Sequence, residues 1–243
     1  MPVTKSAAGA DRVKGDEPPG MDFLIVVGIG LVVALIAHLL NKKRKEAIRA
    51  YASQRGWQYR PQDPALVHRW SSPPFGVGNS RRAAEVLTGE FHGEQAVSFD
   101  YRYSTGSGKN RTTSYFHVVG LHLPAPLPWL RLTPEHLGTR IGRVFGMQDI
   151  EFESQAFNDT WRVQGPEGQF PYDFIHPRMM ERLMQHDAVG QRITVEGQDI
   201  YLYVPGRQNT ERIDEYLNLL LGVVQQIPRH LWLRVGHDPL APR

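Results

Sequence analysis

Residues 21–40 read MDFLIVVGIGLVVALIAHLL, and this stretch decides how the rest of the chain is organised. No charged residue occurs between Phe23 and Leu40, and an apolar run of about 18 residues is near the lower limit for a helix that spans a bilayer. An amphipathic helix of a soluble protein would show a polar stripe at helical spacing, and this stretch shows none. It therefore predicts one membrane-spanning helix over residues 21–40.

Basic residues follow the apolar run at once. Residues 41–49 hold five basic side chains and one acidic side chain, a net charge of +4, whereas the whole chain carries +3. The remainder therefore sums to −1, which argues against nucleic acid as a partner, because a nucleic-acid-binding domain needs a basic face of its own. Two interpretations of the cluster stay open: it binds anionic lipid headgroups, or it only sets the topology of the helix. The cluster consists of Lys42, Lys43, Arg44, Lys45 and Arg49.

The flanking charges also predict an orientation. A cleaved signal peptide has its positive residues before the apolar core and a small-residue cleavage site after it, whereas here the positive cluster follows the core. The positive-inside rule then predicts a single-pass protein of the cell membrane with residues 41–243 in the cytoplasm. The predicted parts are a disordered outer tail at 1–20, the transmembrane helix at 21–40, a basic juxtamembrane helix at 41–56, a connector at 57–82, a cytoplasmic domain at 83–232 and a flexible tail at 233–243.

Composition limits the chemistry of the soluble part. The chain has 243 residues, of which 41% are hydrophobic and 22% charged, and this suits one sizeable folded domain or two small ones. The absence of cysteine excludes disulfides, thiolate metal sites and a cysteine nucleophile. The histidines show no metal-ligand spacing such as H-E-x-x-H, and there is no G-x-S-x-G motif. The sequence therefore indicates no catalytic residue, no metal ligand and no cofactor.

The hydrophobic period changes to two from Ala84 onward, which predicts strands. His92–Gly93 is expected to form a tight turn between two strands, and residues 104–111 (STGSGKNR) a hairpin loop before a third strand. Prolines then interrupt the antiparallel meander. The further predicted elements are strands at 129–132, 149–153 and 161–163, helices at 133–145 and 177–185, and a hairpin at 192–204 that turns at 196–199.

The last predicted helix has the strongest pattern. It begins at Asn209 or Thr210, repeats apolar residues at helical spacing from Ile213 to Ile227, and ends at Pro228. The predicted fold class is α+β: one N-terminal transmembrane helix, then a mainly antiparallel sheet with this amphipathic C-terminal helix on one face. The same elements also suit a small barrel of the pleckstrin-homology type, and fold alone would not determine the function.

Two glycine-containing motifs are candidate sites for a phosphate or another anion. Gly76 and Gly78, together with Arg81 and Arg82, could hold an anion through backbone amides, or they could form a plain flexible connector. Residues 106–109 (GSGK) resemble part of a phosphate loop, but the motif lacks its upstream glycine and a strand follows it. We therefore interpret the second motif as a hairpin tip.

The carboxylates Asp149, Glu151 and Glu153 are a candidate set for acid–base or metal chemistry. Their spacing of two places them on one face of a strand whose other face carries Ile150 and Phe152. We interpret them as a solvated face instead.

Several motifs resemble an uncharacterised family of bacterial single-pass membrane proteins. Residues 152–158, 161–163 and 175–180 read FESQAFN, WRV and IHPRMM, and they resemble that family's pattern of F-E-S-x-x-F-N, an aromatic-x-V pair and a P-x-x-M helix. Gly56–Trp57 and the stretch 87–101 look like actinobacterial proteins of the same kind. The resemblance implies an anchored domain of unknown function, and it brings no activity, substrate or catalytic residue.

The leading interpretation is a membrane-anchored, non-catalytic binding or scaffolding protein. The alternative is a membrane-tethered enzyme of the hydrolase type, which a pocket with converging histidines and carboxylates of shifted pKa would favour. A shallow apolar or basic surface patch would favour binding, and lipid sensing at the inner leaflet is a third interpretation. The expected partners are the lipid bilayer, anionic lipid headgroups, and a protein partner or a second copy joined through the small-residue pair Gly30 and Ala34.

Overall fold

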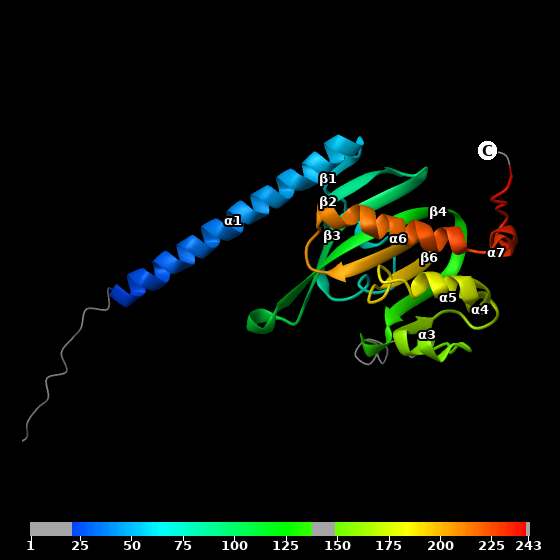
Figure 1. Cartoon of the computed structure of the whole chain (residues 1–243). Helices are drawn as coiled ribbons and strands as arrows, with labels where there is room; N and C mark the ends of the chain where they lie inside the picture. The colour runs from blue at the N-terminus through cyan, green and yellow to red at the C-terminus, as the bar shows by residue number, and fades with distance from the viewer. Residues whose placement is uncertain (1–20, 138–148, 242–243) are drawn as a thin grey trace, which may run out of the picture. The chain divides into compact units, whose positions relative to one another are not determined.

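The computed structural model describes residues 21–137 and 149–241. The chain forms two compact units, Met1–Lys43 and Arg44–Arg243, and helix α1 (Met21–Arg55) begins in the first and ends in the second (Figure 1). The predicted tail at 1–20 and most of the helix predicted at 133–145 lie outside the described residues.

The predicted apolar segment is helical, and the helix does not stop at the basic cluster. Phe23–Arg55 is long and apolar enough to cross a membrane: its most apolar part has a mean hydropathy of 2.9, and 0% of that part is buried. This finding concerns length and composition, and a signal sequence near an N-terminus shares both properties. The helix continues unbroken to Arg55.

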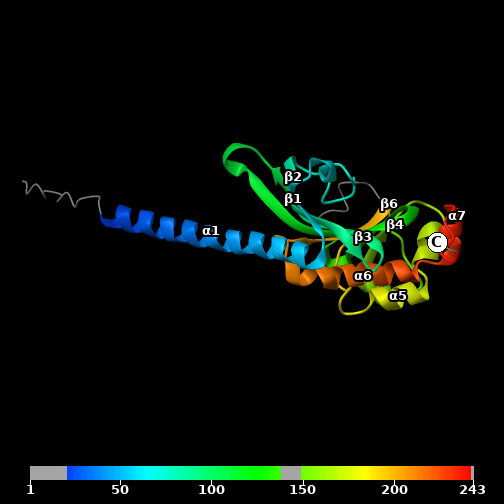
Figure 2. The ribbon, with the colours of Figure 1, turned by 90° about the horizontal axis from the view of Figure 1, so that it is seen from above.

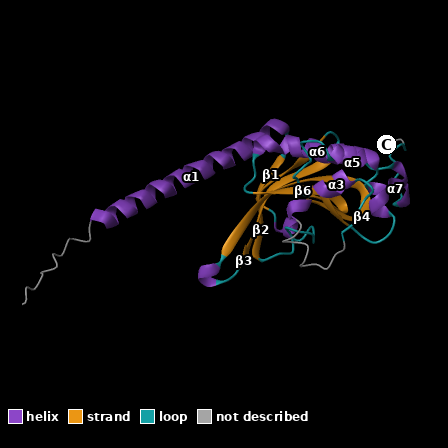
Figure 3. Ribbon diagram, turned by 60° about the horizontal axis from the view of Figure 1, so that its bottom comes forward, coloured by secondary structure: helices purple, strands orange, loops and turns teal. Residues whose placement is uncertain are grey.

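The second unit is an α+β domain on one antiparallel sheet, as the alternation of apolar residues predicts (Figures 1 and 3). The predicted turn at His92–Gly93 is confirmed, and both residues have positive φ, 50° and 87°. The order is β1–β2–β3–β4–β5, and β6 also pairs with β4. The strands are β1 (Gln58–Gln62), β2 (Asn79–Phe91), β3 (Glu94–Thr105), β4 (Thr112–Pro134), β5 (Trp161–Gln164) and β6 (Ile193–Pro205).

Strand β4 does not end at its prolines, contrary to the prediction, but runs on for 23 residues. Pro124, Pro126 and Pro128 are exposed, whereas Ala125 and Leu127 between them are buried. Proline lacks the N–H that a strand ladder uses, and β4 accommodates three because its pairing with β6 is irregular over this stretch. The predicted strand at 129–132 is therefore the end of β4, and the strand also includes the first two residues of the helix predicted at 133.

The predicted hairpin at 192–204 is wrong, because this segment is the single strand β6. Both halves pair with β4, as the partners Leu121↔Ile200 and Leu130↔Val195 show. Gly197 has a φ of 62° and lies opposite the irregular proline stretch, where it permits a bend rather than a reversal. Because β4 is long enough to pair with both halves of β6, the segment 193–205 stays one strand and does not fold back on itself.

The segment predicted as a connector, 57–82, belongs to the sheet and to a core. It contains β1, and its side chains Trp70 and Phe75 are buried against one face of the sheet. Trp70 stacks on Tyr201 of β6 with ring centroids 4.3 Å apart. Prolines and glycines make this segment resemble a loop, but its aromatic residues supply the apolar surface that covers the sheet.

Helices cover the opposite face of the sheet (Figure 2). Helix α6 (Ile213–Gln226) buries Ile213, Leu217, Leu220 and Val223 in the larger core. The sheet is therefore a middle layer between the helices and residues 63–78, which connect β1 to β2. The remaining α-helices of the described residues are α3 (Gln155–Thr160), α4 (Phe170–Phe174), α5 (Pro177–Leu183) and α7 (Arg229–Arg234).

Candidate anion-binding site

Two members of the predicted basic cluster are paired inside the domain. Arg44 Nη1 donates to Asp100 Oδ2 at 2.6 Å, and Lys45 Nζ lies 3.0 Å from Glu85 Oε1. Both carboxylates are buried, with side chains 5% and 7% exposed. The last turns of α1 are thus held on the sheet by ion pairs, in addition to the buried Ile48.

A third member of the cluster also has a partner in the domain. The guanidinium of Arg49 lies 5.3 Å from the ring centroid of Tyr59 on β1, a cation–π contact. Lys42 and Lys43 belong to the first unit. The structure therefore assigns Arg44, Lys45 and Arg49 to the docking of α1 within the domain.

A buried polar network lies beside the Arg44–Asp100 pair. His117 Nε2 is 2.9 Å from Ser98 Oγ, and the backbone N–H of Asn209 donates to His117 Nδ1 at 3.5 Å. Gln208 donates twice: its side-chain amide to Ser98 Oγ at 2.9 Å and its backbone N–H to Asp100 Oδ1 at 2.5 Å. Burial, with a further contribution from the charge of Arg44, lowers the pKa of His117 to about 3.

Serine, histidine and aspartate occur together here, but not in the arrangement of a hydrolase triad. Because Nδ1 of His117 accepts a hydrogen bond, Nε2 carries the proton and donates to Ser98. A catalytic histidine must instead accept the serine proton at that nitrogen and donate from Nδ1 to the carboxylate. Ser98 is 0% exposed, so no substrate reaches it in this conformation. The network fixes the segment around Gln208 against the sheet.

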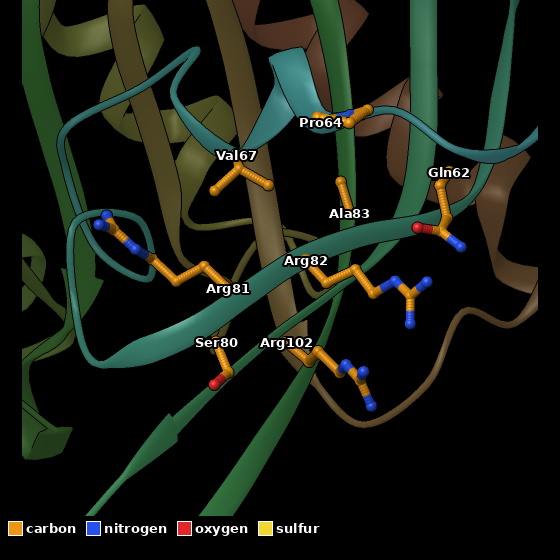
Figure 4. A pocket seen from close by; sticks show the side chains of 8 residues that line it. All are labelled: Gln62, Pro64, Val67, Ser80, Arg81, Arg82, Ala83 and Arg102. Carbon is orange, nitrogen blue, oxygen red and sulfur yellow. The ribbon is translucent and has the colours of Figure 1, made fainter.

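Arg81, Arg82 and Arg102 line a pocket of about 260 Å³ at the edge of the sheet (Figure 4). Arg82 and Arg102 point to the same side, with the amide of Gln62 beside them, and Arg81 points away (Figure 4). No acidic residue lines the pocket. Within the described part of the chain, none of the three guanidiniums forms an ion pair. The other lining residues are Gln62, Pro64, Val67, Ser80 and Ala83.

The strand register explains why these side chains converge. Arg82 and Arg102 are direct partners on β2 and β3, and Gln62 on β1 is opposite Ala84. Residues two apart on a strand share a face, and directly opposite Cβ atoms are about 4.5–5.5 Å apart. Gln62, Arg82 and Arg102 therefore share one face of the sheet. Two like charges in opposite positions destabilise a strand pair.

An irregularity in β2 shapes the pocket. The register shifts between Asn79 and Arg82, and Ser80 has a φ of 52°. Gly78 has a φ of 66°, and a Cβ there would come within 2.6 Å of the Ser104 carbonyl oxygen. Only glycine lets the chain approach β3 so closely. Because β1 ends at Gln62, the start of β2 forms an edge of the sheet on that side.

The structure separates the candidate motifs of the sequence. It brings Arg81 and Arg82 to the pocket, whereas Gly76 and Gly78 do not line it. Residues 106–109 lie in the connection between β3 and β4, as predicted for a hairpin tip. The sequence did not identify Arg102 as a candidate anion-binding residue, because it belongs to a strand with no motif around it.

The predicted strand at 149–153 is wrong, because only Ile150 pairs there, in an isolated bridge to Val163. Asp149 forms an ion pair with Arg162, whereas Glu151 and Glu153 are exposed. Among the described residues, no group of three or more His, Asp or Glu side chains is placed to hold a metal ion.

A second pocket, of about 360 Å³, lies near the C-terminus and is lined by Trp232, His237 and Asp238 among others. Hydrogen bonds from Arg229 and from the backbone of Leu240 lower the pKa of Asp238 to about 2. This carboxylate therefore stays ionised as a partner of Arg229 and does not serve as a proton donor near neutral pH.

Comparison with known proteins adds a likeness of fold. No protein-family model matches the chain, and no curated protein matches it. The chain is similar to the crystal structure of the mycobacterial trehalose monomycolate transport factor A, with a TM-score of 0.54 and 16% identity over 82% of this chain and 98% of that chain. At this identity the likeness concerns the fold alone.

Proposed function

We propose that the protein is a membrane-anchored, non-catalytic binding or scaffolding module. The continuity of α1 carries this proposal: one unbroken helix holds the exposed apolar run and, further on, the core residues Ile48 and Ala52. A signal sequence ends at a small-residue cleavage site, whereas this helix continues into the folded domain. This favours a retained anchor.

The described sites favour binding over the alternative of a hydrolase. In the buried network His117 donates to Ser98 and so cannot activate it. The arginine pocket contains neither a histidine nor a carboxylate, the groups that general acid–base chemistry would need. A basic pocket at a sheet edge is instead suited to hold an anionic group.

The same proposal includes the orientation of the chain in the membrane, its partners and the type of its domain. Residues 1–20 lie outside the cell, and the domain lies in the cytoplasm and includes the segment 57–82 with the predicted 83–232. The lipid bilayer is the primary partner, with anionic headgroups near Lys42 and Lys43, and Gly30 with Ala34 joins two copies or contacts a protein partner. The domain is a variant of the pleckstrin-homology-type barrel. Because the structural neighbour is a transport factor for trehalose monomycolate, we propose a membrane-associated auxiliary role here too.

Fractionation of the intact, C-terminally tagged protein tests the anchor. We expect it in the membrane pellet after alkaline extraction, with an N-terminus before residue 21 by mass spectrometry. A soluble protein, or a mature form that begins beyond residue 40, would contradict the proposal.

Protease treatment of inside-out and right-side-out vesicles tests the orientation: the tag should be digested only in inside-out vesicles.

A further inference from the structure

We propose that Gln62, Arg82 and Arg102 form a binding site for a phosphate group, carried by a phosphate monoester or diester. The site is assembled within the domain from three neighbouring strands, so this inference goes beyond the anchor and can hold or fail independently of it.

The first argument is the uncompensated charge. Arg82 and Arg102 are cross-strand partners, and no carboxylate lines their pocket. Elsewhere in this domain, the partly buried Arg44 and Arg182 meet the acidic partners Asp100 and Asp187, whereas the buried Arg131 donates to the amide oxygen of Gln164. A fold that keeps two guanidiniums side by side gains stability when an anion lies between them.

The second argument is the chemistry of the donors. A guanidinium presents N–H groups in a planar fork that matches two oxygens of a phosphate, and two such forks together with the NH2 group of one amide supply donors along one wall. Gln62 is a neutral donor at the diagonal register position, so it adds a hydrogen bond without adding charge. A tetrahedral oxyanion accepts hydrogen bonds from all three side chains, whereas a cation or an apolar group accepts none.

The location of the site allows two sources of phosphate. Arg44 follows the end of the apolar run by four residues, and its partner Asp100 precedes Arg102 by two residues on the same face of β3. A lipid headgroup and a soluble phosphate compound share the same chemistry. The experiment therefore needs one arm for each.

Hydrogen exchange of the full-length protein tests the site with two probes. In the first arm the protein is in maltoside micelles, which contain no phosphate, and inorganic phosphate is added. In the second arm it is in phosphatidylglycerol nanodiscs without added phosphate. We expect slower exchange at residues 79–83 and 100–103. Protection in the nanodiscs assigns the site to a headgroup, and protection only by inorganic phosphate assigns it to a soluble compound; both support a phosphate site.

Variants separate binding from structure. Arg82→Gln and Arg102→Gln should each weaken the protection at least about tenfold in phosphate concentration, since a hydrogen bond to a charged group is lost. Arg178→Gln, an exposed arginine on α5, is the matched control and should change nothing. Without phosphate, both pocket variants should melt no lower than the unaltered protein, because a repulsive pair is removed. Absence of protection in both arms, protection that survives both substitutions, or a lowered melting temperature would overturn the proposal.

Discussion

Arginine side chains lie on one face of the sheet in two regions, and the two regions differ in the residue that lies opposite the guanidinium. Arg44 meets the buried carboxylate of Asp100, which also accepts the backbone N–H of Gln208. Arg82 meets Arg102 across the strand pair. The first arrangement satisfies a charge inside the protein and holds α1 on the domain. The second leaves two guanidiniums without an acidic residue in the lining of their pocket. Arginine is therefore structural in the first region and a candidate anion-binding residue in the second.

The largest predicted effect breaks the paired region. Asp100→Ala leaves the Arg44 guanidinium and the Gln208 N–H without their acceptor in a buried place, and we expect the free energy of unfolding to fall by about 3 kcal/mol. Denaturant unfolding of the full chain in maltoside, followed by tryptophan fluorescence, measures it. The control Glu215→Ala removes an exposed ion pair with Arg212 and should cost only a few tenths of a kcal/mol. Equal losses for the two variants would mean that the buried pair does not hold the domain together.

A second prediction concerns the pH dependence of the same region. The pKa of His117 is about 3 in the folded protein against an ordinary 6.5, mainly through burial. The unfolded chain therefore takes up this proton first, and the free energy of unfolding falls as the pH drops from 6.5 toward 3. The loss approaches about 1.4 kcal/mol for each pH unit within this window.

The variant His117→Gln isolates this effect. Between pH 6.5 and pH 5, the unaltered protein should lose about 1 to 2 kcal/mol more stability than the variant. His122→Gln is the control, because His122 is 41% exposed and lies beside Asp199. Parallel pH profiles for the unaltered protein and His117→Gln would show that the network accommodates a charged imidazole.

The fold was predictable where local signals agree. The His92–Gly93 turn and the alternation around it define β2 and β3, and the apolar run defines the start of α1. The prediction failed where a long-range partner overrides a local signal. The prolines of β4 are tolerated because the pairing of β4 with β6 is irregular where they lie. Gly197 bends β6 instead of reversing it, since β4 pairs with both halves.

The sequence predicted only part of the candidate site: it identified Arg82 but neither Gln62 nor Arg102. A regular hairpin about His92–Gly93 pairs residues whose numbers add to a constant, as Phe91↔Glu94 and Thr88↔Val97 do. That rule would place Ala83, not Arg82, opposite Arg102. The irregularities of β2 shift the register by one residue and bring the two arginines together. A bulge depends on packing on both faces, so the sequence pattern could not reveal it.

The smallest predicted effect converts the unpaired region into a paired one. Gln62→Glu adds a carboxylate beside Arg82 and Arg102, and without phosphate it should raise the free energy of unfolding by about 0.5 kcal/mol. The same carboxylate should weaken protection by inorganic phosphate, because it occupies the guanidiniums itself. Gln58→Glu is the matched control: it lies on the same strand and face, equally close in sequence to Arg60, but opposite Thr88. If the two variants shift stability and phosphate protection equally, then the effect comes from net charge, and the contrast between the two arginine regions no longer indicates a ligand.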